Sequence, residues 1–99
     1  MKTDPRLVRL GPEDNVLVLA TGLAAGTRLA VNGVETTLAK ALGLGHKVAA
    51  RAISAGETIV KYGAPIGVAT DAIEQGAHVH VQNMRSNYTP TYVLPEGDT

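Results

Sequence analysis

Residues 53–67 read ISAGETIVKYGAPIG, and this stretch decides the fold class. The β-branched run Thr58–Val60 lies between a glycine turn and a second turn that contains Gly63 and Pro65. Short runs rich in Val, Ile and Thr, bounded by glycine and proline, are typical of short strands. The stretch therefore predicts two strands joined by a tight turn, with Tyr62 at that turn.

The same alternation of short apolar runs and turns continues toward both ends of the chain. Asn32-Gly33 separates two of these runs, and Asn-Gly is the strongest two-residue hairpin signal. We expect strands at Leu7–Leu10, Val16–Ala20, Arg28–Val31, Val34–Thr37, Lys47–Arg51, Thr58–Lys61, Ile66–Ala69 and His78–Gln82.

A short unit recurs around three glycines, Gly26, Gly56 and Gly76. Each glycine has an apolar residue three positions before it and another three positions after it. This pattern predicts a glycine with positive φ at a turn, followed by a strand. The glycines are 30 and then 20 residues apart, so the unit indicates a reused turn in one compact fold rather than a solenoid.

Helix is expected in one place at most. The Ala, Leu and Lys content of Thr37–Leu42 favours a short helix, which Gly43 and Gly45 would end. The sequence predicts one domain over residues 1–86. Residues 87–99 contain Pro90 and Pro95 and predict a flexible tail or an arm that contacts a partner.

Composition excludes several classes of protein. The 99 residues carry no net charge, with no cluster of Lys and Arg, so the chain is not expected to bind nucleic acid. With no cysteine, it has neither disulfides nor thiolate metal ligands. No signal peptide or apolar run of membrane-spanning length is evident, so we expect a cytoplasmic protein that does not enter the membrane. Since Phe and Trp are absent, the core must come from Val, Ile, Leu and Ala.

The histidines are the strongest candidates for chemistry. In a strand, His78 and His80 would point to the same face about 7 Å apart, where two imidazoles can bind a metal or an anion. Asn83 could add an oxygen ligand or a hydrogen bond. The alternative is that this is a solvent-facing strand surface. His46 and Lys47 follow a double-glycine turn and could act on a carboxylate substrate, or His46 could simply cap the preceding segment.

Lys61 and Tyr62 form a third candidate pair. A lysine and a tyrosine at a turn could bind a carboxylate or move a proton. The alternative is a tight hairpin with the Tyr62 ring packed over its turn. The sequence alone leaves both interpretations open.

The ordered series of motifs resembles a known family. It begins with Gly-His-Lys-Val-Ala from Gly45, passes through residues 53–67, and ends with Ile-x-x-Gly-x-His-Val-His and Asn83. This series is similar to the SAF-type N-terminal domain, or separate small subunit, of the altronate/galactarate dehydratase family. The sulfolactate sulfo-lyase small subunit is similar at the same places. The resemblance implies a mainly β fold, the β-clip also seen in antifreeze-like domains.

The resemblance also implies a function. The family eliminates water from sugar acids to give 2-keto-3-deoxy acids, is associated with iron, and keeps its larger catalytic part on another domain or subunit. By this resemblance the catalytic residues would be His46, Lys47, Lys61 and Tyr62. His78, His80 and Asn83 would bind substrate or lie beside a metal, with His78 and His80 as metal ligands. Family members often have a further histidine where this chain has Gln82.

The partners expected on this basis are a large catalytic dehydratase subunit and a sugar acid. Fe2+ would be held mainly by the large subunit, and this chain would be inactive alone. The sequence leaves open whether the isolated chain forms a homodimer. Two alternatives remain: a stand-alone SAF-like module that binds a carbohydrate or another ligand, and the small subunit of a sulfolactate sulfo-lyase.

Overall fold

The computed structural model describes residues 2–86, which form nine short strands and no helix. All strand pairs are antiparallel. The strands are β1 (Leu7–Val8), β2 (Val16–Leu19), β3 (Arg28–Val31), β4 (Val34–Thr37), β5 (Lys47–Ala49), β6 (Thr58–Lys61), β7 (Ala64–Ala69), β8 (His78–Val79) and β9 (Met84–Ser86). This arrangement confirms the mainly β fold class.

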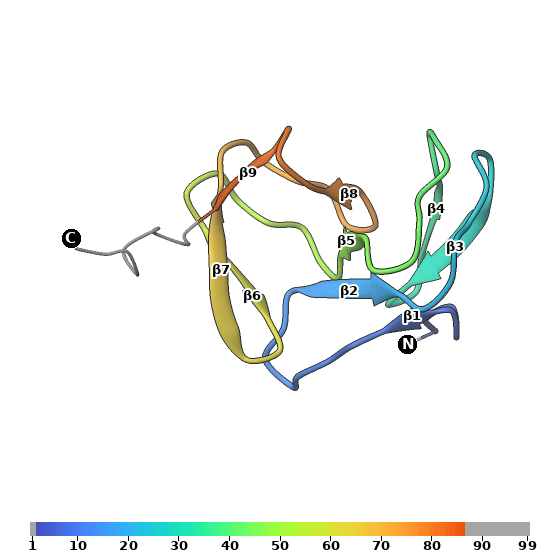
Figure 1. Ribbon diagram of the computed structural model, residues 1–99, viewed down its shortest axis with the longest axis horizontal. Helices are drawn as coiled ribbons and strands as arrows, with labels where there is room; N and C mark the ends of the chain where they lie inside the picture. The colour runs from blue at the N-terminus through green and yellow to red at the C-terminus, as the bar shows by residue number, and fades with distance from the viewer. Residues whose placement is uncertain (1, 87–99) are drawn as a thin grey trace.

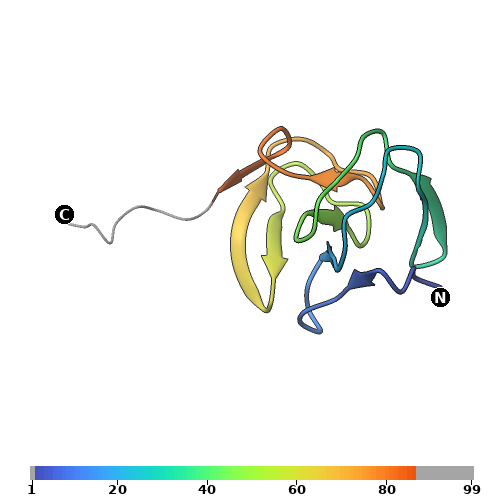
Figure 2. The same ribbon diagram turned by 45° about the vertical axis from the view of Figure 1, so that its right-hand side comes forward.

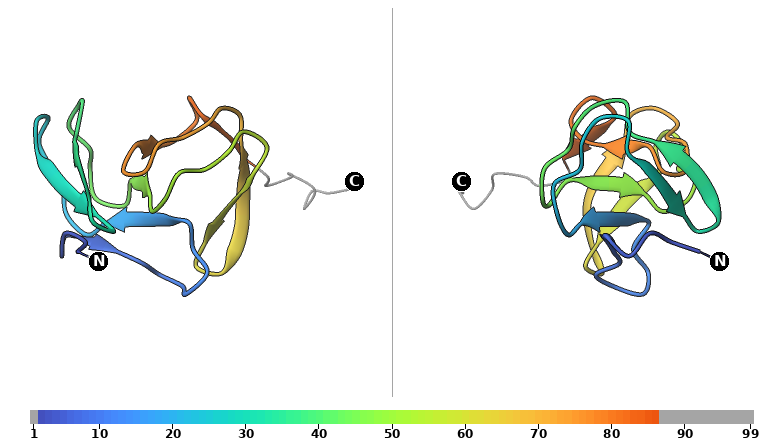
Figure 3. Two further views of the ribbon diagram at one scale, coloured as in Figure 1. Left: turned by 180° about the vertical axis from the view of Figure 1, so that it is seen from behind. Right: turned by 90° about the vertical axis from the view of Figure 1, so that its right-hand side faces the viewer.

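Three small sheets build the molecule. The central sheet has the order β1-β2-β5-β8, and the other two are the β3-β4 hairpin and the β6-β7-β9 sheet. The two hairpins stand at opposite ends of the central sheet (Figures 1 and 2). Seen from behind, the β5-β8 edge lies between them (Figure 3). Residues on β5 and β8 are therefore placed at the junction of the two halves.

The predicted glycine turns are confirmed, and the structure adds a fourth. Gly26, Gly56 and Gly76 have φ values of 84°, 86° and 85°, and Gly45 has a φ of 87° in the same kind of turn. Leu42 and Val48 occupy the apolar positions three residues to either side of Gly45 and are buried. With Gly45 included, the turns form two pairs, Gly26 with Gly56 and Gly45 with Gly76, each about 30 residues apart. The same glycine turn, followed by a strand, thus occurs four times, as two pairs.

Two apolar clusters form the core. One includes residues of the β3-β4 hairpin, and the other includes residues of the β6-β7 hairpin. Leu17, Leu29 and Val48 belong to the first cluster, and Val16, Ile59 and Val79 belong to the second. Every buried apolar residue is Leu, Val, Ile or Ala, as the composition predicted. Isolated bridges between Leu23 and Leu42, and between Ile53 and Ile73, close equivalent loops in the two halves. Full burial of one such side chain contributes about 1.5–3 kcal/mol.

The predicted helix over Thr37–Leu42 is wrong. Thr37 ends β4, and Leu38 and Leu42 are both buried in the first core cluster. The Leu38 N–H donates to the Thr27 carbonyl, and the Leu42 N–H donates to Leu23. These long-range bonds take the donors that a single helical turn would use, and so short a helix has little stability of its own.

Near the C-terminal end, one strand is shorter than the sequence predicted and one further strand is present. The strand expected at His78–Gln82 ends at Val79, because residues 81–83 turn and leave Val81 76% exposed. The structure adds β9, which pairs with β7. Gly67 permits this pairing, since a Cβ there would lie 2.6 Å from the Arg85 carbonyl oxygen. The predicted tail, residues 87–99, lies outside the described residues. No helix in the described part of the chain could cross a membrane.

Candidate functional site

The three histidines meet at one edge of the central sheet. His46 follows the Gly45 turn, His78 lies on β8, and His80 follows β8. The His46 Nδ1 and His78 Nε2 atoms are 3.1 Å apart. The three ring centroids are separated by 5.2–5.5 Å, and the rings of His78 and His80 are stacked. One nitrogen from each ring lies within 4.8 Å of the other two.

Strand pairing explains how His46 reaches the other two. β5 and β8 are antiparallel neighbours, with Lys47 opposite Val79 and Val48 opposite His78. Gly45 and Gly76, both with positive φ, start these two strands after equivalent turns. The pairing therefore brings together residues that are 32 positions apart in the sequence.

Asn83 holds the segment that carries His78 and His80. Its side-chain amide donates to the His78 carbonyl at 2.9 Å, and its Oδ1 accepts from the His80 N–H at 3.0 Å. Gln82 also donates to the His78 carbonyl. Because both ends of the Asn83 amide contact backbone, the geometry gives this residue a positioning role beside the histidines.

Burial and nearby positive charge keep His78 neutral. Its pKa is lowered to about 4, first by burial and then by His46, His80, Lys40 and Lys47. Its Nδ1 atom is buried and has no hydrogen-bond partner. Among the described residues, no carboxylate joins the group of three histidines. At neutral pH His78 therefore offers an unprotonated ring nitrogen without a counter-ion.

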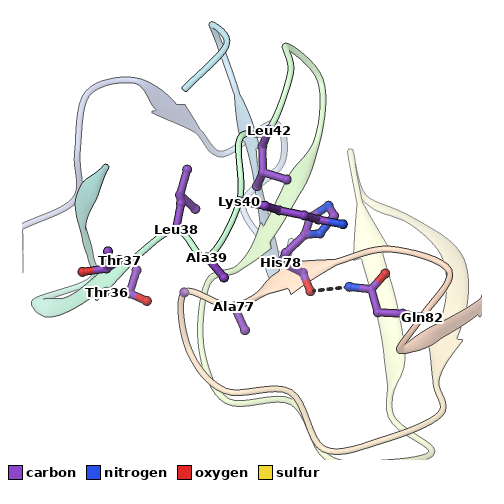
Figure 4. A pocket seen from close by; sticks show the side chains of 10 residues that line it. Thr36, Thr37, Leu38, Ala39, Lys40, Leu42, Ala77, His78 and Gln82 are labelled. Atoms are coloured by element: carbon purple, nitrogen blue, oxygen red, sulfur yellow. Dashed lines mark hydrogen bonds between the residues drawn. The ribbon is translucent and has the colours of Figure 1, made fainter. Parts of the chain in front are cut away.

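Two lysines, Lys40 and Lys47, lie within electrostatic range of His78. Lys47 is half-buried, and its pKa is lowered by burial and by Lys61. Lys40 is exposed and lies on the rim of a cavity of about 350 Å³, which His78 and Gln82 also line (Figure 4). Since lysines bind carboxylates by charge, the arrangement suits an anionic ligand that reaches the imidazoles.

Lys61 and Tyr62 lie apart from the three histidines. Tyr62 is in the turn between β6 and β7 and is 76% exposed. This turn lies at the bottom of the molecule in Figure 1, whereas β8 lies near the top. Lys61, beside it on β6, is half-buried and acts electrostatically on Lys47. The structure thus gathers His46, His78, His80 and Lys47 and leaves Tyr62 at a distance.

Sequence reasoning missed two polar features. Lys40 was assigned to the expected helix, and no local signal distinguishes it from a solvated lysine. Asp14 is 4% exposed, and its carboxylate accepts from the backbone N–H groups of Gly11, Tyr62 and Gly63 at 2.9, 2.6 and 2.8 Å. Burial acts to raise the pKa of Asp14, but these N–H donors outweigh it and lower that pKa. Asp14 therefore supports the hairpin tip.

The donor set fits a metal ion of the kind that the family resemblance implied. Three imidazoles suit Fe2+, Zn2+ and neighbouring transition metals, whereas Mg2+ and Ca2+ prefer oxygen ligands. His46, His78 and His80 supply such a set with their nitrogens already close together. The described residues therefore offer three nitrogen donors, one more than the His78 and His80 pair predicted from the sequence.

Comparison with known proteins supports the family resemblance that the sequence motifs indicated. The model of the altronate/galactarate dehydratase SAF domain matches residues 5–87. Altronate dehydratase of Escherichia coli is 40% identical over 80 residues, and that of Bacillus subtilis is 36% identical over 93 residues. These matches cover 81% and 86% of this chain but only 16% and 19% of the relatives.

A second kind of relative is similar in size to this chain. The (2R)-sulfolactate sulfo-lyase subunit alpha of Chromohalobacter salexigens is 37% identical over 76 residues, which cover 71% of this chain and 81% of that subunit. The matched family model spans most of the chain and contains all three histidines. The chain belongs to the altronate/galactarate dehydratase SAF domain family, whose members are homologous to parts of lyases.

Proposed function

We propose that this chain is the small subunit of a sugar-acid dehydratase, a hydro-lyase that forms 2-keto-3-deoxy acids. In this proposal the face that carries His46, His78 and His80 forms one wall of an active site, and a large catalytic subunit completes it. The observation that carries the proposal is the convergence of three imidazoles at one edge of the central sheet, with Lys40 and Lys47 within electrostatic range of His78. We also propose that the enzyme acts in the cytoplasm.

Dehydration of a hydroxy acid needs three kinds of group. A base removes the proton next to the carboxylate, a cation stabilises the resulting enolate, and an acid protonates the leaving hydroxide. Here Lys40 and Lys47 would hold the substrate carboxylate, and His46 or His80 would move protons. The described residues supply no carboxylate to this face. The remaining groups would come from the large subunit, with any Fe2+ that it holds.

The predicted roles of Lys61 and Tyr62 depend on the partner. Lys61 lies within electrostatic range of Lys47. Tyr62 would reach the substrate only if the large subunit brought the active site over the hairpin tip. A Tyr62→Phe variant of the assembled enzyme tests this contact, since removing a catalytic hydroxyl lowers kcat, whereas a purely structural ring tolerates the change.

The test is co-expression of the full chain with its candidate large subunit, followed by anaerobic assays with iron(II). We expect turnover of altronate or galactarate by the complex and none by either chain alone. The double variant His78→Ala/His80→Ala should lose at least about a hundredfold in kcat. Arg28→Ala, at an exposed position on β3, is the control and should keep full activity. Unchanged turnover in the double variant, or dehydration by this chain alone, would overturn the proposal.

A second candidate function is the small subunit of a sulfolactate sulfo-lyase. The match over 81% of the sulfo-lyase subunit alpha favours it. The leaving group would then be sulfite, so (2R)-sulfolactate belongs in the same assay, with sulfite release as the measurement. Ligand binding without turnover of any of these acids, even with the large subunit present, would instead support a stand-alone binding module.

A further inference from the structure

We propose that His46, His78 and His80 together bind one transition-metal ion, with a coordination position left open for an anionic oxygen ligand. The ring nitrogens of His46 and His78, 32 positions apart, already face each other, and the His80 ring stacks against that of His78. With the metal bound, His46 and His80 are ligands rather than acids or bases, so the groups that move protons in the proposed enzyme would come from the large subunit. The inference does not depend on the proposed enzymatic activity, because binding is measured on this chain alone.

The distances suit a single ion. Two ligands about 2.0–2.1 Å from a tetrahedral metal lie about 3.3 Å apart. The His46 Nδ1 and His78 Nε2 atoms are 3.1 Å apart. One nitrogen from each ring lies within 4.8 Å of the other two. His80 is exposed, so a small side-chain rotation can bring its nitrogen closer.

The ring protons can be arranged to leave both facing nitrogens free for an ion. For the facing nitrogens of His46 and His78 to hydrogen-bond each other instead, one must carry a proton and the other a lone pair. If the His78 ring carries its proton on Nε2, which faces His46, its buried Nδ1 has a lone pair without a donor. If the proton is on Nδ1 instead, that buried N–H has no acceptor. A metal ion would accept both facing lone pairs at once, with the His78 proton on Nδ1 as in the second tautomer. No aspartate or glutamate in the described residues competes for the histidines.

The lysines predict what fills the open position. Lys40 and Lys47 lie within electrostatic range of His78, and Lys40 and His78 line the same cavity (Figure 4). Their positive charge opposes a bare divalent ion but favours an ion that also holds an anion. A carboxylate entering by the cavity would contact the metal and Lys40 together. The site should therefore prefer the metal in the presence of a carboxylate.

The experiment uses the full, untagged chain after removal of metals with a chelator. Titration with Co2+ should show visible d–d absorption at one equivalent, and Zn2+ should displace the Co2+. Mg2+ should not bind, since imidazole ligands suit the later transition metals. His46→Ala and His80→Ala should each weaken Co2+ binding by more than about a hundredfold, because even indirect supporting partners are worth 10–100-fold.

Asp71→Asn is the control, because it removes an exposed carboxylate that is not part of the group of potential ligands, and it should leave Co2+ binding unchanged. Circular dichroism verifies that each variant is folded, and exposed His80 decides the result if a His46 or His78 variant does not fold. Failure of the wild-type chain to bind Co2+ or Zn2+, or wild-type affinity in His80→Ala, would overturn the proposal.

The open position has its own measurement. Glycolate, a simple hydroxy acid, should shift the absorption of the Co2+-loaded chain, and Lys40→Ala should weaken that response by at least about threefold, as expected for one exposed charge contact. A spectrum that glycolate does not alter would show that the coordination sphere is closed. Glycolate binding to the metal-free chain with equal affinity would show that the histidines bind the anion directly.

Discussion

The β3-β4 and β6-β7 hairpins begin with the same glycine turn, but different groups hold their tips in place. Asn32 and Gly33 form one tip, where the Asn32 N–H donates to Thr3 Oγ1 and the Gly33 N–H donates to the Lys2 carbonyl. At the other tip, buried Asp14 accepts from the N–H groups of Tyr62 and Gly63. Local sequence makes each turn, and a distant segment completes it.

The two turns that precede β5 and β8 also share a backbone conformation but differ in what packs against them. Gly45 and Gly76 have almost equal φ values, but a Cβ added at Gly45 would meet open space. A Cβ at Gly76 would lie 2.7 Å from Thr36 Cγ2. The second half is therefore packed tightly against the first hairpin at the turn that leads to His78. This close packing helps to fix where the His78 ring sits.

The largest effect is expected from the glycine pair. Gly76→Ala should reduce the free energy of unfolding by about 3 kcal/mol, from the left-handed backbone and the clash with Thr36 together. Gly45→Ala should cost only about 1–2 kcal/mol, from the backbone alone. Urea denaturation measures both.

The double variant Gly76→Ala/Thr36→Ser isolates the clash, since serine lacks the Cγ2 methyl group. It should recover part of the loss. Equal destabilisation by the two single variants would show that the halves are not packed differently at these turns.

A smaller, pH-dependent effect should separate the two hairpin tips. The pKa of Asp14 is lowered in the folded chain, so Asp14 stabilises the fold above its unfolded pKa of about 3.9 and loses this contribution as the pH falls. The stability difference between the wild-type chain and Asp14→Asn should therefore shrink between about pH 5 and pH 2.

Thermal unfolding at a series of pH values measures this difference. Thr3→Ala, at the other tip, removes no charge and should lower stability equally at every pH. A constant difference between the wild-type chain and Asp14→Asn would contradict the role of the charged carboxylate.

The smallest effect concerns the residues at the tips themselves. Tyr62 has a φ of 55° and Asn32 a φ of 48°, but asparagine tolerates this region better than other side chains. Tyr62→Asn should raise the free energy of unfolding by about 0.5–1 kcal/mol. Tyr62→Ala, which keeps the Cβ penalty, is the control and should gain less. A loss of stability in Tyr62→Asn would mean that the exposed ring makes a packing contribution.

Much of the fold could be predicted from the glycine and proline residues that mark the turns between short strands. Three strands, including both that flank Asn32-Gly33, have the predicted bounds, because their turns are specified by nearby residues. β9 escaped prediction because its pairing depends on Gly67, which admits the Arg85 backbone from another segment. The Gly45 turn was overlooked as a fourth copy, although Leu42 and Val48 show the same spacing.

The candidate site was predicted only in part. The spacing of His78 and His80 was sufficient to place two imidazoles side by side. His46 joined them only in the folded chain, through the pairing of β5 with β8. Lys40 gave no sequence signal, since its position depends on the loop that replaced the expected helix.

Local sequence specifies the glycine turns, most of the strands and the apolar residues of the core, because these depend on backbone preferences and spacing within a few residues. It also carried the family resemblance, which the family match confirms. Only the tertiary structure decided which turns face each other, where the Asp14 carboxylate acts and which histidines meet. These features depend on contacts between segments about 30 or more residues apart, which no local pattern encodes.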